Sequence, residues 1–138
     1  MGDKVSHLQM IQSVIGRLAL NSFQVKGWSV VLVSALFALA SKDSAPTLVH
    51  VAYLPAVVFW ALDGYFLWQE RLFRRLYDRV RAASGATDFS MDTLPNESGA
   101  PTWRSSVLSR TVLPLHGVVV AAVLAATIVF NTSHVGRR

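Results

Sequence analysis

The stretch LVHVAYLPAVVFWALDGYFLW, from Leu48 to Trp68, is a long apolar run that contains a single acidic residue, Asp63. A helix that crosses the hydrocarbon core of a bilayer needs about 20 residues, because each residue advances it by about 1.5 Å. The run has this length, so we predict a membrane-spanning helix over residues 48–69. A carboxylate inside such a helix is costly and is by default a candidate functional group.

The overall composition is typical of a membrane protein. Hydrophobic residues make up 52% of the 138 residues and charged residues only 15%, whereas about 25% charged residues is usual in soluble domains. We therefore expect a single membrane domain over residues 1–138. The formal net charge of +5 is explained by anionic lipid headgroups and topology, so a nucleic-acid partner is not expected.

Two further segments are predicted to cross the membrane. Residues 27–41 include GWSVVLVSALFALA, which is short for a full crossing. We extend that helix back through Lys26, whose long side chain can reach the headgroups. Residues 111–130, TVLPLHGVVVAAVLAATIVF, are rich in β-branched side chains. Their length and their lack of alternation favour a spanning helix over a strand.

The remaining segments complete an all-α prediction. Residues 4–26 carry apolar and small side chains at helical 3-4 spacing: Leu8, Ile11, Ile15, Leu18, Ser22 and Val25. We predict an amphipathic helix there, which lies in the membrane interface or packs against partner helices. Residues 70–82 are predicted to extend the second span into the cytoplasm, and residues 83–104 to form a loop. The fold class is therefore an all-α membrane protein with an N-terminal amphipathic helix and three transmembrane helices.

The distribution of basic residues predicts the orientation. Lysine and arginine gather in cytoplasmic segments, and the segment between the second and third spans carries seven of them, against only Lys42 between the first and second. We expect a cytoplasmic N-terminus and a C-terminus outside, although Arg137 and Arg138 weigh weakly the other way. Three tryptophans then fall near the cytoplasmic boundary, where aromatic belts lie: Trp28, Trp68 and Trp103.

Four polar residues are expected to meet inside the membrane. Asp63 and His116 each lie about five residues to the cytoplasmic side of the middle of a span, roughly 7 Å from the midplane. They can therefore meet within one chain or across a subunit interface. Ser29 lies near that level and Lys26 is within reach. A carboxylate in lipid takes up a proton or finds a donor, for which His116 and Lys26 are the candidates.

Two interpretations of this polar cluster stay open. It is either a hydrogen-bonded group that orients the helices or a polar patch that lines an ion path. A metal site is not expected, because the histidines and the acid lack the i,i+3 or i,i+4 spacing of helical ligands. No nucleophile elbow, phosphate loop or dinucleotide fingerprint is present. We therefore predict no catalytic residue, no cofactor and no enzymatic activity.

Small residues suggest close packing of helices. Small residues recur every four positions on two spans: Gly117, Ala121 and Ala125 on the third, and Ser34 and Ala38 on the first. Such stripes let helix backbones approach closely. Three spans leave little protein to shield Asp63 and His116, so a homo-oligomer is expected. Packing of the same stripe within one chain is equally compatible with the pattern.

The segment 70–82 is also a candidate phosphate-binding surface. It carries five arginines: Arg71, Arg74, Arg75, Arg79 and Arg81. The guanidinium fork matches the geometry of phosphate. The expected partners are membrane phospholipids or a nucleotide signal, and topology with lipid anchoring is the simpler explanation.

Two segments of the chain resemble a family of small bacterial multi-span inner-membrane proteins without assigned enzymology: HLQMIQSVIGRLALNSFQVKGWSVVLVSALFALA, His7 to Ala40, and FWALDGYFLWQERLFRRLYDRV, Phe59 to Val80. The resemblance implies a location in the bacterial inner membrane. Some small membrane proteins of this kind sit beside antiviral defence genes and disrupt membranes. We therefore expect a homo-oligomeric pore-forming or ion-conducting protein that acts in antiphage defence. The alternative is a non-conducting anchor or adaptor that recruits a soluble partner through its cytoplasmic helices.

Overall fold

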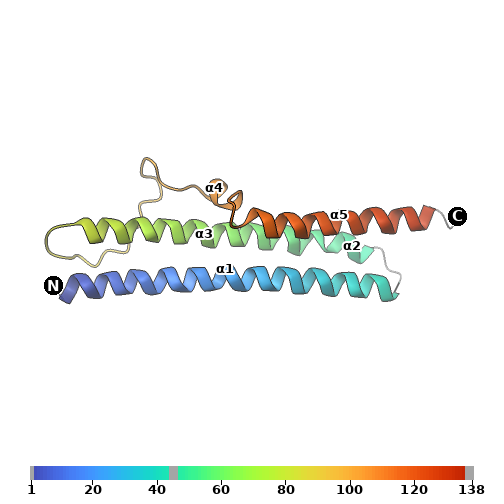
Figure 1. The fold of residues 1–138 in the computed structure, drawn as a ribbon, viewed down its shortest axis with the longest axis horizontal. Coiled ribbons are helices and arrows are strands. Elements are labelled where there is room, and N and C mark those ends of the chain that lie inside the picture. Colours follow the sequence, from blue (N-terminus) through green and yellow to red (C-terminus); the bar gives the residue numbers. More distant parts are fainter. Residues whose placement is uncertain (1, 44–46, 136–138) are drawn as a thin grey trace.

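Two long antiparallel helices form the frame of the molecule, and a third helix packs beside them (Figure 1). The structure is a computed structural model that describes residues 2–43 and 47–135, and within these ranges it contains no strand. The all-α class is therefore confirmed. The helices in chain order are α1 (Gly2–Asp43), α2 (Thr47–Val51), α3 (Tyr53–Ala82), α4 (Trp103–Val107) and α5 (Leu113–Val135).

The segments 4–26 and 27–41 belong to one helix, α1, which runs through Gly27 without a break. The physical reason is that one buried face continues through both segments, with Ile15, Ser22 and Ser29 at intervals of seven residues, or about two helical turns. α3 lies along this face. This corrects the expectation of a separate amphipathic helix in the membrane interface. At about 1.5 Å per residue the 42 residues of α1 measure about 63 Å, twice the hydrocarbon thickness of about 30 Å.

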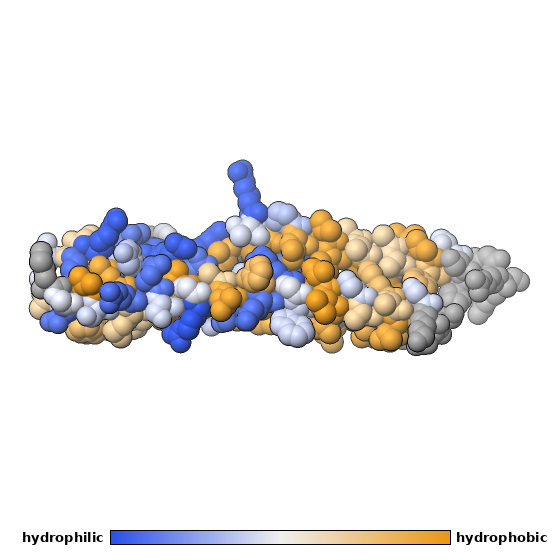
Figure 2. Space-filling model, turned by 60° about the horizontal axis from the view of Figure 1, so that its bottom comes forward, coloured by the Kyte–Doolittle hydropathy of each residue, from blue (hydrophilic) through white to orange (hydrophobic). Residues whose placement is uncertain are grey.

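The rod divides into an apolar half and a polar half, as Figure 2 shows. We define the apolar half as residues 27–41, 47–68 and 113–132, and the polar half as residues 2–26 and 69–102. Three helical segments are long and apolar enough to cross a membrane: Gly2–Ser41, Leu48–Ala82 and Leu113–Thr132. Each of the first two also runs far into the polar half.

Each half has its own apolar core. The core of the apolar half contains Val33 of α1, Ala52 between α2 and α3, Ala56 of α3, and Val119 and Val123 of α5. The core of the polar half joins α1 to α3 through Ile11, Ile15 and Leu76. Polar side chains occupy the space between these two cores, and they form the candidate site described below.

The second span is interrupted near its start. Pro55 has no backbone N–H, and its ring crowds the carbonyl four residues earlier, that of Val51. At Ala52 the backbone N–H donates to the carbonyls of both Leu48 and Val49, at 3.2 and 3.3 Å. The predicted segment 48–69 is therefore built from α2 and most of α3. α3 itself continues to Ala82, so residues 70–82 are helical.

The segment 83–104 is irregular up to Thr102, where α4 begins. The hydroxyl of Thr102 accepts a hydrogen bond from the Ser105 backbone N–H at 3.2 Å, and the Ser105 hydroxyl accepts from the Thr102 N–H at 3.3 Å. This reciprocal pair is a capping box. α4 corrects the expectation of a loop to residue 104. The last helix, predicted over 111–130, is α5, which begins later, at Leu113, and reaches Val135.

α4 lies directly against α3 at Gly64. A Cβ atom built at Gly64 would overlap the Val107 Cγ2 atom and would lie 3.0 Å from the Val107 Cα atom. The backbones of α3 and α4 can approach this closely only because residue 64 has no side chain.

The first prediction concerns this close approach. Replacing Gly64→Ala should lower the free energy of unfolding by about 1–3 kcal/mol, because the added methyl group overlaps Val107. Gly16→Ala is the matched control, since open space surrounds Gly16 and alanine is favoured over glycine inside a helix by about 0.5–1 kcal/mol. Titration of unfolding with sodium dodecyl sulfate measures both. Equal stability of the two variants would contradict the packing of α4 on α3.

Candidate functional site

The carboxylate of Asp63 lies at the meeting point of three helices. Asp63 on α3 and His116 on α5 are fully buried, with 0% exposure. One carboxylate oxygen, Oδ1, accepts hydrogen bonds from Ser22 Oγ at 2.5 Å and from Lys26 Nζ at 2.6 Å, both on α1. The other oxygen, Oδ2, accepts from His116 Nε2 at 3.0 Å. We call Ser22, Lys26, Asp63 and His116 the polar network.

The two α1 residues of the polar network are themselves joined. Ser22 and Lys26 are four residues apart, so they lie on the same face of α1. Lys26 Nζ donates to Ser22 Oγ at 2.8 Å as well as to Asp63. Lys26 thus acts as an ammonium donor within an ion pair, and it is not a base that could activate the Ser22 hydroxyl. The arrangement gives no support to nucleophilic chemistry.

The polar network is electrically neutral in its simplest protonation state. The Asp63 carboxylate only accepts hydrogen bonds, so the proton in its bond to His116 belongs to Nε2. His116 Nδ1 is buried and has no hydrogen-bond partner among the described residues. A proton on Nδ1 would add a buried positive charge without an acceptor, which is costly. The geometry therefore favours a neutral imidazole, with the Lys26 charge balancing that of Asp63.

A tryptophan fixes the plane of the imidazole. The rings of Trp60 and His116 are stacked, with centroids 6.4 Å apart and planes within 5° of each other. Trp60 in turn donates its indole N–H to the carbonyl of Val107 at 3.1 Å. α3, α4 and α5 are thus connected around the imidazole of His116, which donates to Oδ2 of Asp63.

Ser29 was expected in this cluster but does not take part. It is fully buried, and its hydroxyl has no hydrogen-bond partner among the described residues. Seven residues separate Ser29 from Ser22, a distance of about 10 Å along the helix axis. Ser22 takes the expected place because the antiparallel packing sets it level with Asp63. Its position as the polar member of the predicted stripe on residues 4–26 was the signal in the sequence.

The small-residue stripes lie outside the bundle. Ala121 and Ala125 on α5 are exposed, and a Cβ atom at Gly117 would have nothing within 4 Å. On α1, Ser34 and Ala38 are exposed as well. α5 instead turns its buried face to the bundle, with His116, Val119 and Val123. The stripes therefore do not pack against the other helices of the same chain, although the sequence pattern allowed this.

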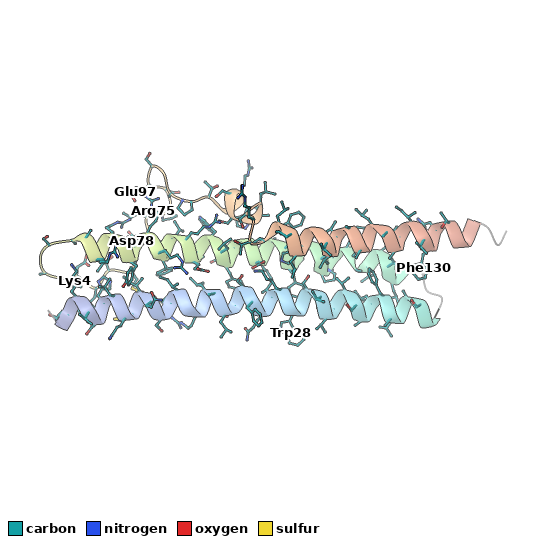
Figure 3. All side chains as sticks on the ribbon, in the orientation of Figure 1. Lys4, Trp28, Arg75, Asp78, Glu97 and Phe130 are labelled. Atoms are coloured by element: carbon teal, nitrogen blue, oxygen red, sulfur yellow. The ribbon has the colours of Figure 1, made fainter. Side chains whose placement is uncertain are left out.

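The arginines of residues 70–82 all have partners within the chain. Arg74 pairs with Glu70 at 2.7 Å and Arg81 with Asp78 at 3.8 Å. Arg75 and Arg79 both reach Glu97 of the loop, at 3.5 and 3.2 Å. Arg71 donates to Ser106 Oγ of α4 at 3.2 Å. Three of the five arginines therefore hold the segment 83–107 against α3, and Figure 3 shows Arg75 of α3 beside Glu97 of the loop. These contacts do not test the expected role of the arginines as phosphate ligands.

Neither metal chemistry nor similarity to known proteins indicates a role for the site. Among residues 2–43 and 47–135 there is no group of three or more metal-ligating side chains that could hold an ion. Comparisons with known protein families, with curated proteins and with solved structures found no match. The function must therefore be argued from the geometry of this chain.

The second prediction concerns the ion pair of the polar network. Asp63→Asn leaves the Lys26 ammonium without a counter-charge. We expect a loss of about 3 kcal/mol in the free energy of unfolding, at the lower end for a broken buried pair because the Lys26 side chain is 20% exposed. The variant Asp63→Asn/Lys26→Met should recover part of the loss, since it removes both charges.

The matched control for this experiment is Glu97→Gln. It breaks two exposed ion pairs, which should cost no more than about 1 kcal/mol. Detergent-unfolding titrations compare the three variants with the wild type. An Asp63→Asn protein as stable as Glu97→Gln would show that the polar network does not hold the helices together.

Proposed function

We propose that this protein is a non-conducting membrane anchor of the bacterial inner membrane whose polar half carries a soluble partner on the cytoplasmic side. The observation that carries the proposal is the closure of the polar network within one chain. Asp63 and His116 have no exposure even in the single protomer. A carboxylate that is neutralised and enclosed by its own chain is suited to joining helices and poorly suited to lining an ion path.

The outward faces of the apolar half support the same proposal. Large apolar side chains dominate them: Trp28, Val30, Val31 and Leu39 on α1, Leu54, Val57 and Val58 on α3, and Val118, Leu124, Ile128 and Val129 on α5. A water-filled pore between copies of this chain needs a polar face directed at its axis. Faces of this kind instead suit contact with lipid tails or with apolar helices.

The length of α1 supports a projecting stalk. About 63 Å of helix in a hydrocarbon layer of about 30 Å leaves roughly half of it outside the membrane. The seven basic residues between the second and third spans support a cytoplasmic position of this half under the positive-inside rule. The opposing residues Arg137 and Arg138 lie outside the described residues.

The far side of α1 is the surface that we assign to the soluble partner. In the polar half, the segment 83–102 lies against α3 and is bonded to Lys4 and His7 of α1, but it leaves the side of α1 that faces away from α3 open (Figures 1 and 3). Exposed residues there mix polar and apolar types: Val5, Gln9, Met10, Ser13 and Arg17. A mixed composition of this kind is usual for non-obligate protein interfaces.

We also propose that the anchor self-associates through α5. Shielding of Asp63 and His116 no longer requires a second copy, because the single chain already buries both. The exposed stripe Gly117, Ala121 and Ala125 is the remaining argument, since small residues in a spanning helix favour close helix pairs.

The third prediction distinguishes an anchor from a channel. Wild-type protein in liposomes should give no more ion flux than protein-free liposomes, and Asp63→Asn should not change this. In cells, a photo-crosslinking amino acid at Ser13 should capture a soluble protein, whereas the same group at Val31, exposed in the apolar half of the same helix, should not. Flux through the wild type that Asp63→Asn alters would favour the pore-forming alternative.

The fourth prediction concerns self-association, and the lack of cysteine in the chain makes it simple to test. Ala121→Cys should form disulfide-linked dimers when membranes are oxidised. The control is Val123→Cys, because Val123 is fully buried against the bundle on the opposite side of α5. Equal crosslinking of the two variants, or none with Ala121→Cys, would count against pairing through α5.

A further inference from the structure

We propose that α4 and its junction with α5, residues 103–113, form a binding surface for the phosphate groups of anionic phospholipids, with Arg104 and Arg110 as the ligands. The inference rests on the membrane-spanning arrangement and is independent of whether the polar half binds a soluble partner. It assigns lipid binding to arginines other than the five of residues 70–82.

α4 lies near the boundary between the apolar half and the polar half. Trp103 donates its indole N–H to the carbonyl of Ala61 at 3.3 Å, and Val107 lies against Gly64. α4 is therefore level with Asp63. The apolar part of α1 and the start of α5 lie at the same height, because Lys26 and His116 both bond to Asp63. Asp63 lies five residues before Trp68, where the apolar half of α3 ends, which is about 7.5 Å along the helix axis. In a bundle that spans a bilayer, the long side chains of arginines at the height of α4 can therefore reach the headgroup region near the end of the apolar half (Figures 1 and 2).

The segment 103–113 carries two positive charges. Arg104 and Arg110 are exposed, and within the described part of the chain neither guanidinium forms an ion pair. By contrast, the arginines of residues 70–82 are each bonded to a carboxylate or to α4, as described above. Two uncompensated positive charges six residues apart thus face the headgroup region, where each attracts anionic lipid.

The apolar residues beside Arg104 and Arg110 favour a lipid over a free phosphate as the ligand. Leu108 is 64% exposed and follows Arg104 by four residues, so the two share the outward side of α4. Trp103 is 42% exposed, and Leu113, at the start of α5, is exposed as well. Tryptophan and leucine beside arginine are typical of segments that lie in the membrane surface. Exposed apolar groups of this size gain nothing from a soluble phosphate.

The test is native mass spectrometry of the full-length protein in detergent with added phosphatidylglycerol or phosphatidylcholine. We expect the wild type to retain phosphatidylglycerol preferentially. Arg104→Gln/Arg110→Gln should weaken this retention at least tenfold, since each charge near a membrane surface accounts for about a fivefold effect. Retention of phosphatidylcholine should not change.

The matched control is Arg74→Gln/Arg81→Gln, which removes two exposed but ion-paired arginines and should change retention less than twofold. Arg104→Lys/Arg110→Lys keeps the charge and should preserve most of the binding, which tests the proposal even if the glutamine variant is unstable. Equal loss in the control, or unchanged retention in Arg104→Gln/Arg110→Gln, would overturn the proposal. Displacement of the lipid by millimolar inorganic phosphate would also overturn it, in favour of a site for soluble phosphate.

Discussion

The carboxylate of Asp63 sets the register of the whole bundle. The apolar cores on either side of it are built from Ile, Leu, Val and Ala side chains, and such contacts tolerate sliding. The bonds from Lys26 and His116 do not, because a shift of one residue moves a helix by about 1.5 Å and turns it by about 100°. A shift of α1 would then leave the charges of Lys26 and Asp63 unpaired, and a shift of α5 would leave one buried carboxylate oxygen without its donor. One buried acid thus fixes the positions of α1 and α5 against α3.

This role changes how an acid within a predicted span should be interpreted. An ionisable residue in a membrane helix usually suggests a pathway or an active group. Here one chain supplies a counter-charge, a hydroxyl and an imidazole, and it encloses the carboxylate completely. The argument that copies of the chain must assemble in order to shield Asp63 therefore loses its basis. Any assembly has to be driven by the outward faces of the helices.

The sequence predicted the parts of the structure that depend on composition and on counting along one segment. The three apolar segments were identified by length, and the common depth of Asp63 and His116 followed from their distance to the middle of each span. The stripe on residues 4–26 marked Ser22 as an inward-facing polar residue, but the choice between Ser22 and Ser29 as the partner of Asp63 depends on how far α1 is offset against α3. That offset follows from packing across the bundle and not from any local pattern.

Two other features were hidden for different reasons. α4 has five residues, too few for a periodic pattern, and only the Thr102–Ser105 capping pair marks its start. The continuity of α1 was obscured by the change from polar to apolar composition near Gly27. The buried residues of α1 from Ile11 to Val33 nevertheless follow one another at intervals of four or seven residues, which is a helical period. The periodicity was therefore a better guide to the helix than the composition.

The basic residues of the chain have two physical roles that a count along the sequence cannot separate. Arg75 and Arg79 form ion pairs with Glu97, which compensate part of their charge and hold the loop against α3. Arg104 and Arg110 keep their charge free at the height where the apolar half ends. A rule that counts positive residues treats all four alike, whereas a lipid surface responds to the uncompensated ones. In the proposed arrangement, the strongest attraction for lipid therefore lies beside α4, while the polar halves of α1 and α3 extend beyond the membrane surface.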